Sequence, residues 1–405
     1  MLAIIIFCLA YLGIALGRIP GLAIDRVGVA LLGAIAMVIF GGLSLESAIK
    51  AIDYSTIILL YALMIISAQL RLGGFYSWVA LKIVPHYKRP RRFLLIIMLV
   101  SALLSAVLAN DIVCFAFTPV LAFSLLQAGL NPLPFLIGLA VSSNIGSAAT
   151  IIGNPQNMLI GQAGKLDFAG FFFWCGPPSL LALLASYLIL LLVFRFQLQA
   201  SPKTSPAEPP RDLQPFNQWQ TAKGLTAIIV LTALFFTPIP RELSALAIAG
   251  LLLCSRKMKT RHIMGLVDWH LITLFCALFI IIHGISQGNF LTTIMDRFSA
   301  MGQSITEPPV LTFFSVVLSN LFSNVPATML LIRFLDPQQY AQWFILAVSS
   351  TFAGNLFLLG SIANLIVVEQ AAAYDIKITF RQHAAAGFPV TIISLAILVT
   401  WFLLI

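Results

Sequence analysis

Charged residues are scarce in this chain. They make up 9% of its 405 residues, whereas about a quarter of the residues in a soluble globular protein are charged. Hydrophobic residues make up 60%, and apolar segments near the ~20 residues that a helix needs to cross a bilayer recur from Leu2 to the C-terminus. The composition therefore excludes a soluble fold and leaves no room for a water-soluble catalytic domain.

Cysteine and histidine are also few, with five of each. The cysteines have no CxxC or metal-ligand spacing, so we expect buried free thiols and no disulfide framework or zinc site. The histidines form no HExxH motif, and we expect neither an enzyme nor a cofactor other than a coupling ion. The segment 2–17 follows no basic region and precedes no small-residue cleavage site, so we expect a retained helix and not a signal peptide.

The net charge of +9 is better explained by membrane topology than by a nucleic-acid partner, because the basic residues lie between apolar segments. Most of them fall in connections that would share one side of the membrane: Arg18, Arg26, Lys82, Lys88, Arg89, Arg91, Arg92, Arg195, Lys203, Arg211, Lys223, Arg256, Lys257, Lys259, Arg261, Lys377 and Arg381. The positive-inside rule places that side in the cytoplasm. Both termini are then predicted to face outside.

The hydropathy pattern divides the chain into two similar halves. Helices are predicted near 2–17, 27–41, 54–72, 133–163 and 170–196, and again near 223–237, 241–254, 269–285, 341–369 and 385–404, with re-entrant hairpins at 93–128 and 308–334. The stretch between the halves is polar and rich in proline, which is typical of a disordered linker. The predicted organisation is a first transmembrane repeat (1–196), a cytoplasmic linker (197–222) and a second, inverted repeat (223–405).

Polar residues recur at equivalent positions in the two halves. The segment from Asp53 aligns with that from Asp268 at an offset of 215, and Ser142 to Asn157 aligns with Ser349 to Asn364 at an offset of 207. An odd number of crossings in each half makes the second half inverted. The predicted fold class is an all-α polytopic membrane protein: an inverted-topology repeat of two halves, each with five transmembrane helices plus one re-entrant hairpin, with broken helices at the midplane.

Each hairpin candidate is too short for two full crossings and has a polar tip. We place the tips at Asn110 and Asp111 and at Ser323 and Asn324, where they would meet in the protein interior. The alternative is that both asparagines only satisfy backbone groups at helix ends. Asp111 would carry a proton or bind a cation, or else cap the second arm of its hairpin. Asp53 and Asp268 are interpreted as helix caps, and His283 as a structural histidine in preference to a proton relay.

A long segment interrupted by small and polar residues follows each hairpin. The interruptions contain Ser147, Thr150, Gly153, Asn154 and Asn157 in the first half and Asn355, Gly360, Ser361 and Asn364 in the second. An unwound helix frees carbonyl oxygens that bind cations and N–H groups that bind anions. Close packing of helices through glycine and serine is the alternative, and it does not explain the repeated asparagines.

Four motifs resemble the paired signatures of the ion transporter superfamily: "VLANDIVCFAFTPV" (107–120), "NIGSAATIIGNPQNMLIG" (144–161), "SNLFSNVPATMLL" (319–331) and "GNLFLLGSIANLIVVEQA" (354–371). That group includes arsenite permeases, divalent-anion symporters, citrate transporters and some sodium/proton antiporters. The resemblance implies that both tips and both broken helices surround one substrate site with flanking sodium sites. It also implies elevator-like movement against a scaffold that holds the remaining helices and a contact compatible with a homodimer.

The tips differ from those of dicarboxylate symporters, which carry Ser-Asn-Thr. Here the triplets are Ala109-Asn110-Asp111 and Ser323-Asn324-Val325, which look closer to the arsenite-permease-like branch. No arginine or lysine falls at an expected site position. We expect a proton- or sodium-coupled secondary transporter of a small anion or neutral oxyacid in the cell inner membrane; the alternatives are a sodium-coupled dicarboxylate or sulfate symporter and a sodium/proton antiporter. A channel is disfavoured by the repeat within one chain.

Overall fold

The computed structural model describes residues 2–16, 23–199, 214–255, 257–288, 293, 295–297 and 304–404. Within these ranges the chain is built from helices and their connections, without a β-strand. The middle of the expected linker, 200–213, lies outside the described residues, as do Arg18 and Arg256 among the basic residues used for the topology. The division into two repeats and a linker stays a prediction.

The first half contains the following helices: α1 (Leu2–Leu16), α2 (Arg26–Ile39), α3 (Leu45–Ala51), α4 (Tyr54–Leu72), α5 (Phe75–Ile83), η1 (Val84–Lys88), α6 (Pro90–Val107), α7 (Asn110–Gln127), α8 (Leu133–Ser147), α9 (Pro155–Ala163), α10 (Phe168–Val193) and η2 (Gln197–Gln199). Of these, α4, α6, α7 and α10 are long and apolar enough to cross a membrane.

The second half contains α11 (Gln218–Leu234), α12 (Arg241–Leu253), α13 (Thr260–Met264), α14 (Trp269–Ser286), α16 (Pro308–Phe322), α17 (Asn324–Leu331), η3 (Ile332–Phe334), α18 (Tyr340–Ala353), η4 (Leu358–Gly360), α19 (Ile362–Ala372) and α20 (Phe380–Leu404). Of these, α14 and α20 have the length and composition of a membrane span. Both interruptions expected from the sequence are present, between α8 and α9 and between α18 and α19.

Helix boundaries differ from the expectation at the first hairpin and at the start of α11. The arms of the first hairpin, α6 and α7, have 18 residues each, which is longer than the short arms inferred from the sequence, because only Leu108 and Ala109 separate them. Helix α11 begins at Gln218, inside the expected linker, because the Asn217 side chain accepts a hydrogen bond from the Gln220 N–H at 3.1 Å and caps the helix.

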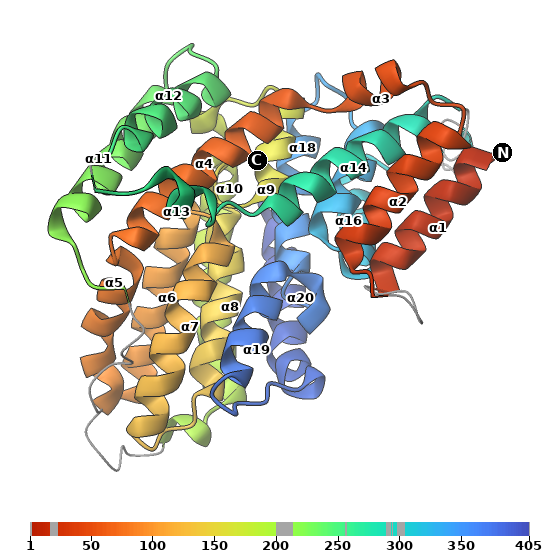
Figure 1. Ribbon diagram of the computed structural model, residues 1–405. Coiled ribbons are helices and arrows are strands. Elements are labelled where there is room, and N and C mark those ends of the chain that lie inside the picture. The colour runs from red at the N-terminus through yellow and green to blue at the C-terminus, as the bar shows by residue number, and fades with distance from the viewer. Residues whose placement is uncertain are drawn as a thin grey trace.

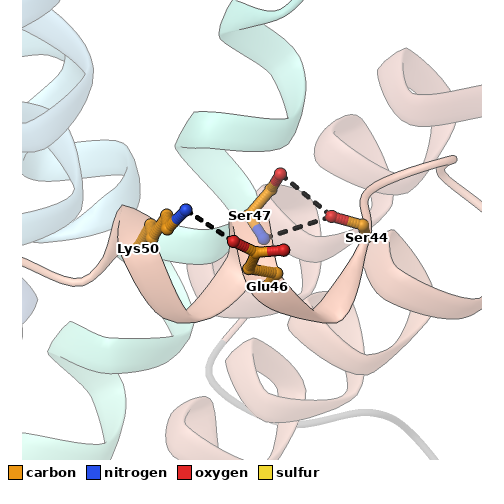
Figure 2. Close-up of polar contacts among 4 residues, drawn as sticks. All are labelled: Ser44, Glu46, Ser47 and Lys50. Atoms are coloured by element: carbon orange, nitrogen blue, oxygen red, sulfur yellow. Dashed lines mark hydrogen bonds and ion pairs between the residues drawn. The ribbon is translucent and has the colours of Figure 1, made fainter.

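Two short helices, α3 and α5, were not expected, because each is too short to give a hydropathy signal. The Ser44 hydroxyl caps α3 by accepting a hydrogen bond from the Ser47 N–H at 3.2 Å. Lys50 then pairs with Glu46 at 2.6 Å one turn apart (Figure 2), an exposed contact that contributes a few tenths of a kcal/mol. Local capping and pairing therefore hold α3 on the surface.

The two longer helices of the duplicated segment begin in the same way. The Asp53 carboxylate accepts a hydrogen bond from the Thr56 N–H at 3.0 Å at the start of α4. The Asp268 carboxylate accepts one from the Leu271 N–H at 2.9 Å at the start of α14. The interpretation of both aspartates as helix caps is confirmed.

Helices from the two halves interlock, as the ribbon shows (Figure 1). Helix α4 packs against α12, and its counterpart α14 packs against α2. Helix α7 packs against α19, and its counterpart α17 packs against α9. Helix α10 packs against α20. For each of these contacts between an element of the first half and one of the second, the equivalent elements of the opposite halves are also in contact. The hairpin of each half therefore lies against the broken helix of the other half.

Candidate functional site

The tip of the first hairpin, tip 1 (residues 108–111), contacts the interruption of the first broken helix, break 1 (residues 148–154). The Asn110 N–H donates to the Gly153 carbonyl oxygen at 3.2 Å, and the Asn110 carbonyl oxygen accepts from the Ser143 hydroxyl at 3.1 Å. The Thr150 hydroxyl donates to the Ala106 carbonyl oxygen on α6. Backbone groups of the hairpin and of the broken helix therefore satisfy one another.

The tip of the second hairpin, tip 2 (Ser323 and Asn324), contacts break 2 (residues 354–361) through a side chain, whereas Asn110 contacts break 1 through its backbone. The Asn324 side-chain amide donates to the carbonyl oxygens of Gly360 and Ser350, both at 3.1 Å. Ser323 turns the chain between α16 and α17 with φ 76° and ψ 159°, a backbone conformation that strongly favours glycine. The partners of tip 2 are thus the counterparts of Gly153 and Ser143 at tip 1.

An asparagine one turn beyond each break ties the unwound backbone together. Asn157 donates its amide to the carbonyl oxygens of Ser147 at 3.2 Å and Thr150 at 3.0 Å. Asn364 donates to the carbonyl oxygens of Gly354 at 2.8 Å and Phe357 at 3.3 Å. These four acceptors correspond to one another at the same offset of 207 residues as the two asparagines, so both breaks have the same internal geometry.

Asn144, in the last turns of α8, joins tip 1 to both broken helices. Its side-chain oxygen accepts from the Asn110 amide at 3.0 Å and from the Ser361 hydroxyl at 2.9 Å. Its amide nitrogen donates to the side-chain oxygens of Asn355 at 2.9 Å and Asn364 at 3.1 Å. All five side chains are buried, and because buried polar networks specify geometry when their members are paired, this network fixes tip 1 against break 2.

Thr351 occupies the equivalent position in the second half. Its hydroxyl accepts from the side-chain amides of Asn154 at 3.2 Å and Gln156 at 3.3 Å. The Asn154 amide also donates to the Ser147 hydroxyl at 2.9 Å. The first break is therefore joined to α18 just as the second break is joined to α8.

Two glycines of the breaks, Gly153 and Gly360, are closely surrounded. A Cβ on Gly153 would collide with the backbone of Ser147, and one on Gly360 would lie 2.7 Å from the Asn320 side-chain oxygen. Close backbone approach thus requires glycine at position 153, whereas the nearest neighbour of position 360 is a side-chain atom.

Several buried amide groups at this centre keep unused hydrogen-bonding capacity. The side-chain oxygens of Asn110 and Asn157 and the side-chain nitrogen of Asn355 have no partner among the described residues. Unpaired buried groups are costly unless water, an ion or a ligand pairs with them. Within the described ranges there is no group of three or more His, Cys, Asp or Glu residues that could hold a metal ion, so the polar atoms available are amides, hydroxyls and carbonyls.

Asp111 lies apart from this amide network. It is half-buried in the first turn of α7 and accepts no hydrogen bond from the described residues, so the structure gives no support to the capping alternative for Asp111. Asp111 lines a cavity together with Arg71 and Asp268. Ser323 lines a different cavity, which it shares with Asp268.

The structure thus brings together eleven of the thirteen expected site residues in one hydrogen-bonded centre: Asn110, Ser147, Thr150, Gly153, Asn154, Asn157, Asn324, Asn355, Gly360, Ser361 and Asn364. Thr150 joins it through its carbonyl oxygen. His283 pairs with Gln287 near the end of α14, outside the centre.

Sequence reasoning missed three residues. Asn144 was counted among the polar residues of the broken helix but not as the residue that connects the others, and Thr351 was likewise passed over. Arg71 was not among the expected site residues, and it lines the cavity at tip 1. An ionisable residue within an apolar span is itself a signal of function.

The fold and this polar centre define a membrane transporter. The family model for citrate transporters matches residues 4–353, and the chain belongs to that family. It is 33% identical over 337 residues to the inner membrane protein YbiR of Escherichia coli, covering 82% of this chain and 83% of that protein. It is 27% identical to the silicon efflux transporter LSI3 of rice, Oryza sativa subsp. japonica, covering 94% of this chain and 92% of that one.

Other comparisons agree. A putative transporter, arsB, of Dictyostelium discoideum is 26% identical and covers 93% of this chain and 87% of that one. Among solved structures, the YdaH transporter of Alcanivorax borkumensis has a similar fold, with a TM-score of 0.55 at 13% identity over 99% of this chain and 97% of that one. The expected resemblance to the ion transporter superfamily is confirmed.

Proposed function

We propose that the protein is a secondary active transporter of a small anion or oxyacid. The observation that carries this proposal is the hydrogen-bonded centre around Asn144, in which a hairpin tip meets both broken helices. Such a centre offers amides and hydroxyls in the protein interior, where a polar solute finds partners that lipid cannot supply. The family model and the silicon efflux relative favour substrates from carboxylates to neutral oxyacids.

We further propose that the two halves are inverted repeats, each with five crossings and one re-entrant hairpin, and that transport proceeds by elevator-type alternating access. The exchange of helix contacts between the halves supports this proposal, because a pseudo-two-fold axis between two repeats produces such pairs. The hairpins and broken helices would move as one unit against a scaffold that includes α4 and α14. The protein would lie in the cell inner membrane with both termini outside, the linker cytoplasmic and the scaffold compatible with a homodimer.

Two features support coupling to an ion. Asp111 accepts no hydrogen bond from the described residues and lines a largely apolar cavity, so a proton would relieve the cost of its charge. The unpaired oxygens of Asn110 and Asn157 are ligands of the type that hard cations such as sodium prefer. Asp111 is therefore the candidate for proton coupling, and the side-chain oxygens of Asn110 and Asn157 are the candidates for sodium coupling.

Uptake into liposomes that contain the purified full-length protein tests this proposal. Arsenite, silicic acid, sulfate, succinate and citrate are supplied under imposed proton or sodium gradients. Saturable flux of one of these solutes that follows one gradient is the expected result. Sodium/proton exchange without solute flux would move the protein to the antiporter alternative, and flux that does not saturate would indicate a channel.

A further inference from the structure

A cavity of about 160 Å³ lies beside tip 1, among helices of both halves of the chain. Its wall comes from α4, tip 1, α9, α11, the start of α14 and α19, and it is mostly apolar. The charged side chains in this wall are those of Arg71, Asp111 and Asp268. The space is large enough for several water molecules or for a small oxyanion.

Arg71 is held at this cavity by an aromatic ring rather than by an acid. Its guanidinium carbon lies 4.1 Å from the centroid of the Phe115 ring on α7, one turn after Asp111. Among the described residues, the single ion pair within 4.0 Å joins Lys50 and Glu46. Neither Asp111 nor Asp268 therefore pairs with Arg71, although all three line one cavity.

A half-buried guanidinium without an acceptor is expensive, because its five N–H donors lose water without gaining a partner. Stacking on Phe115 offsets part of this cost and fixes the plane of the group. A guanidinium fixed in this way presents a pair of parallel donors that match two oxygens of a carboxylate or an oxyanion. The acceptor that Arg71 lacks should therefore be a carboxylate or an oxyanion.

We propose that Arg71 binds the anionic form of the transported solute in this cavity, before or after the solute occupies the amide centre. The ligand is a small soluble carboxylate or oxyanion that accepts two hydrogen bonds from the guanidinium. This inference rests on the proposed transport function and narrows its substrate class to solutes that carry a charge when they bind. Arg71 would then be a specificity-determining residue on the scaffold side of tip 1.

The carboxylates of Asp111 and Asp268, which line the same cavity, repel an anion. Removing the charge of Asp111 should therefore strengthen anion binding, whereas removing the charge of Arg71 should weaken it. A residue that only filled space or only anchored α4 would not give these opposite signs. The pair of variants Arg71→Gln and Asp111→Asn separates an electrostatic role from a structural one.

Binding is measured on the full-length protein in nanodiscs of zwitterionic lipid, titrated with sulfate, succinate or citrate and followed by isothermal calorimetry. The apparent Kd of at least one anion should rise about tenfold or more in Arg71→Gln and less in Arg71→Lys, because a lysine keeps the charge but not the bidentate geometry. It should fall in Asp111→Asn. Arg333→Gln, in a separate cavity near Lys50 and Asp53, is the matched control and should leave the Kd unchanged.

Equal Kd values for wild type and Arg71→Gln would overturn this inference and leave the proposed transport function standing. Wild-type protein that binds none of these soluble anions but binds lipids with anionic headgroups through Arg71 would also overturn it, because the ligand of Arg71 would then be a lipid headgroup. Wild-type protein that binds an anion through Arg71 but moves no solute in liposomes would contradict the transport function and retain the binding site. A melting temperature measured for each variant identifies loss of binding that comes from unfolding.

Discussion

The Asn144 amide donates a hydrogen bond to the Asn355 side-chain oxygen at 2.9 Å across 211 residues of sequence. This contact joins the end of α8 in the first half to break 2 in the second half. Because Asn144 also accepts from Asn110 at tip 1, a single side chain positions a hairpin tip against the opposite broken helix. The account of this protein as a transporter rests on that arrangement.

Replacing Asn144 by alanine should abolish transport and lower the free energy of unfolding by about 3 kcal/mol. The reason is that the buried partners on Asn110, Asn355 and Asn364 would lose hydrogen bonds with no water to replace them. Initial uptake rates and thermal unfolding in detergent measure the two effects. Asn131→Ala, which removes the hydrogen bonds to Gln197 and from the Leu133 N–H of an exposed asparagine, is the control, and equal losses in both variants would contradict the special role of Asn144.

A side chain at Gly153 should disrupt break 1. In Gly153→Ala the new Cβ would collide with the backbone of Ser147, and since that contact involves backbone atoms, the unwound segment itself must shift. We expect loss of solute uptake with protein still inserted in the membrane. Gly250→Ala adds the same methyl group where nothing lies within 4 Å and should transport at the wild-type rate; normal uptake in Gly153→Ala would refute the geometry described for break 1.

Replacing Ser323 by glycine should stabilise the protein. Its backbone, with φ 76° and ψ 159°, lies in a region that costs a residue other than glycine about 1–3 kcal/mol. Ser323→Gly should therefore raise the melting temperature, and Ser323→Val should lower it. Lys165→Gly, at a second residue with positive φ (49°) outside the hairpin tips, provides a comparison in a loop. A lower melting temperature in Ser323→Gly would mean that the hydroxyl contributes more than the backbone strain costs.

Asp111→Asn should remove the response of uptake to an imposed pH gradient if the carboxyl group carries the coupled proton. The amide keeps the size of the side chain and cannot exchange a proton in this pH range. Uptake is compared with and without a pH gradient of one unit across the liposome membrane. Asp375→Asn, on an exposed turn, should behave as wild type; a variant of Asp111 that still follows the gradient would assign the coupling to another group.

Much of this fold follows from the sequence because hydropathy and duplication are strong signals. The caps at Asp53 and Asp268 and the interruptions near Gly153 and Gly360 could each be inferred from residue type and repeated position. The short helices α3 and α5 could not, since hydropathy does not detect a helix of fewer than ten residues on the surface. The full length of the hairpin arms was also missed, because the segment 93–128 was judged too short for two full crossings, whereas α6 and α7 have 18 residues each.

The identities of the candidate site residues were easier to infer than their connections. Asn110, Asn355 and Asn364 stand out as polar residues in apolar surroundings, yet nothing in the sequence states that Asn144 contacts all three. Such a contact depends on the crossing of α7, α8 and α19 in space. Arg71 was missed for a related reason, because its place at a helix end suggested that it lies at the membrane surface. Its contact with Phe115 on α7, which places its guanidinium near tip 1, depends on how the helices pack.

Initial rates of solute uptake for Asn110→Ala and Asn324→Ala, measured beside wild type in liposomes with matched protein content, test the central claim most directly. The account predicts that both variants insert and fold but lose transport, because Asn110→Ala removes the amide hydrogen bond to Asn144 and Asn324→Ala removes the amide hydrogen bonds to Gly360 and Ser350. Wild-type rates in both variants would contradict a substrate site formed by the hairpin tips and the broken helices.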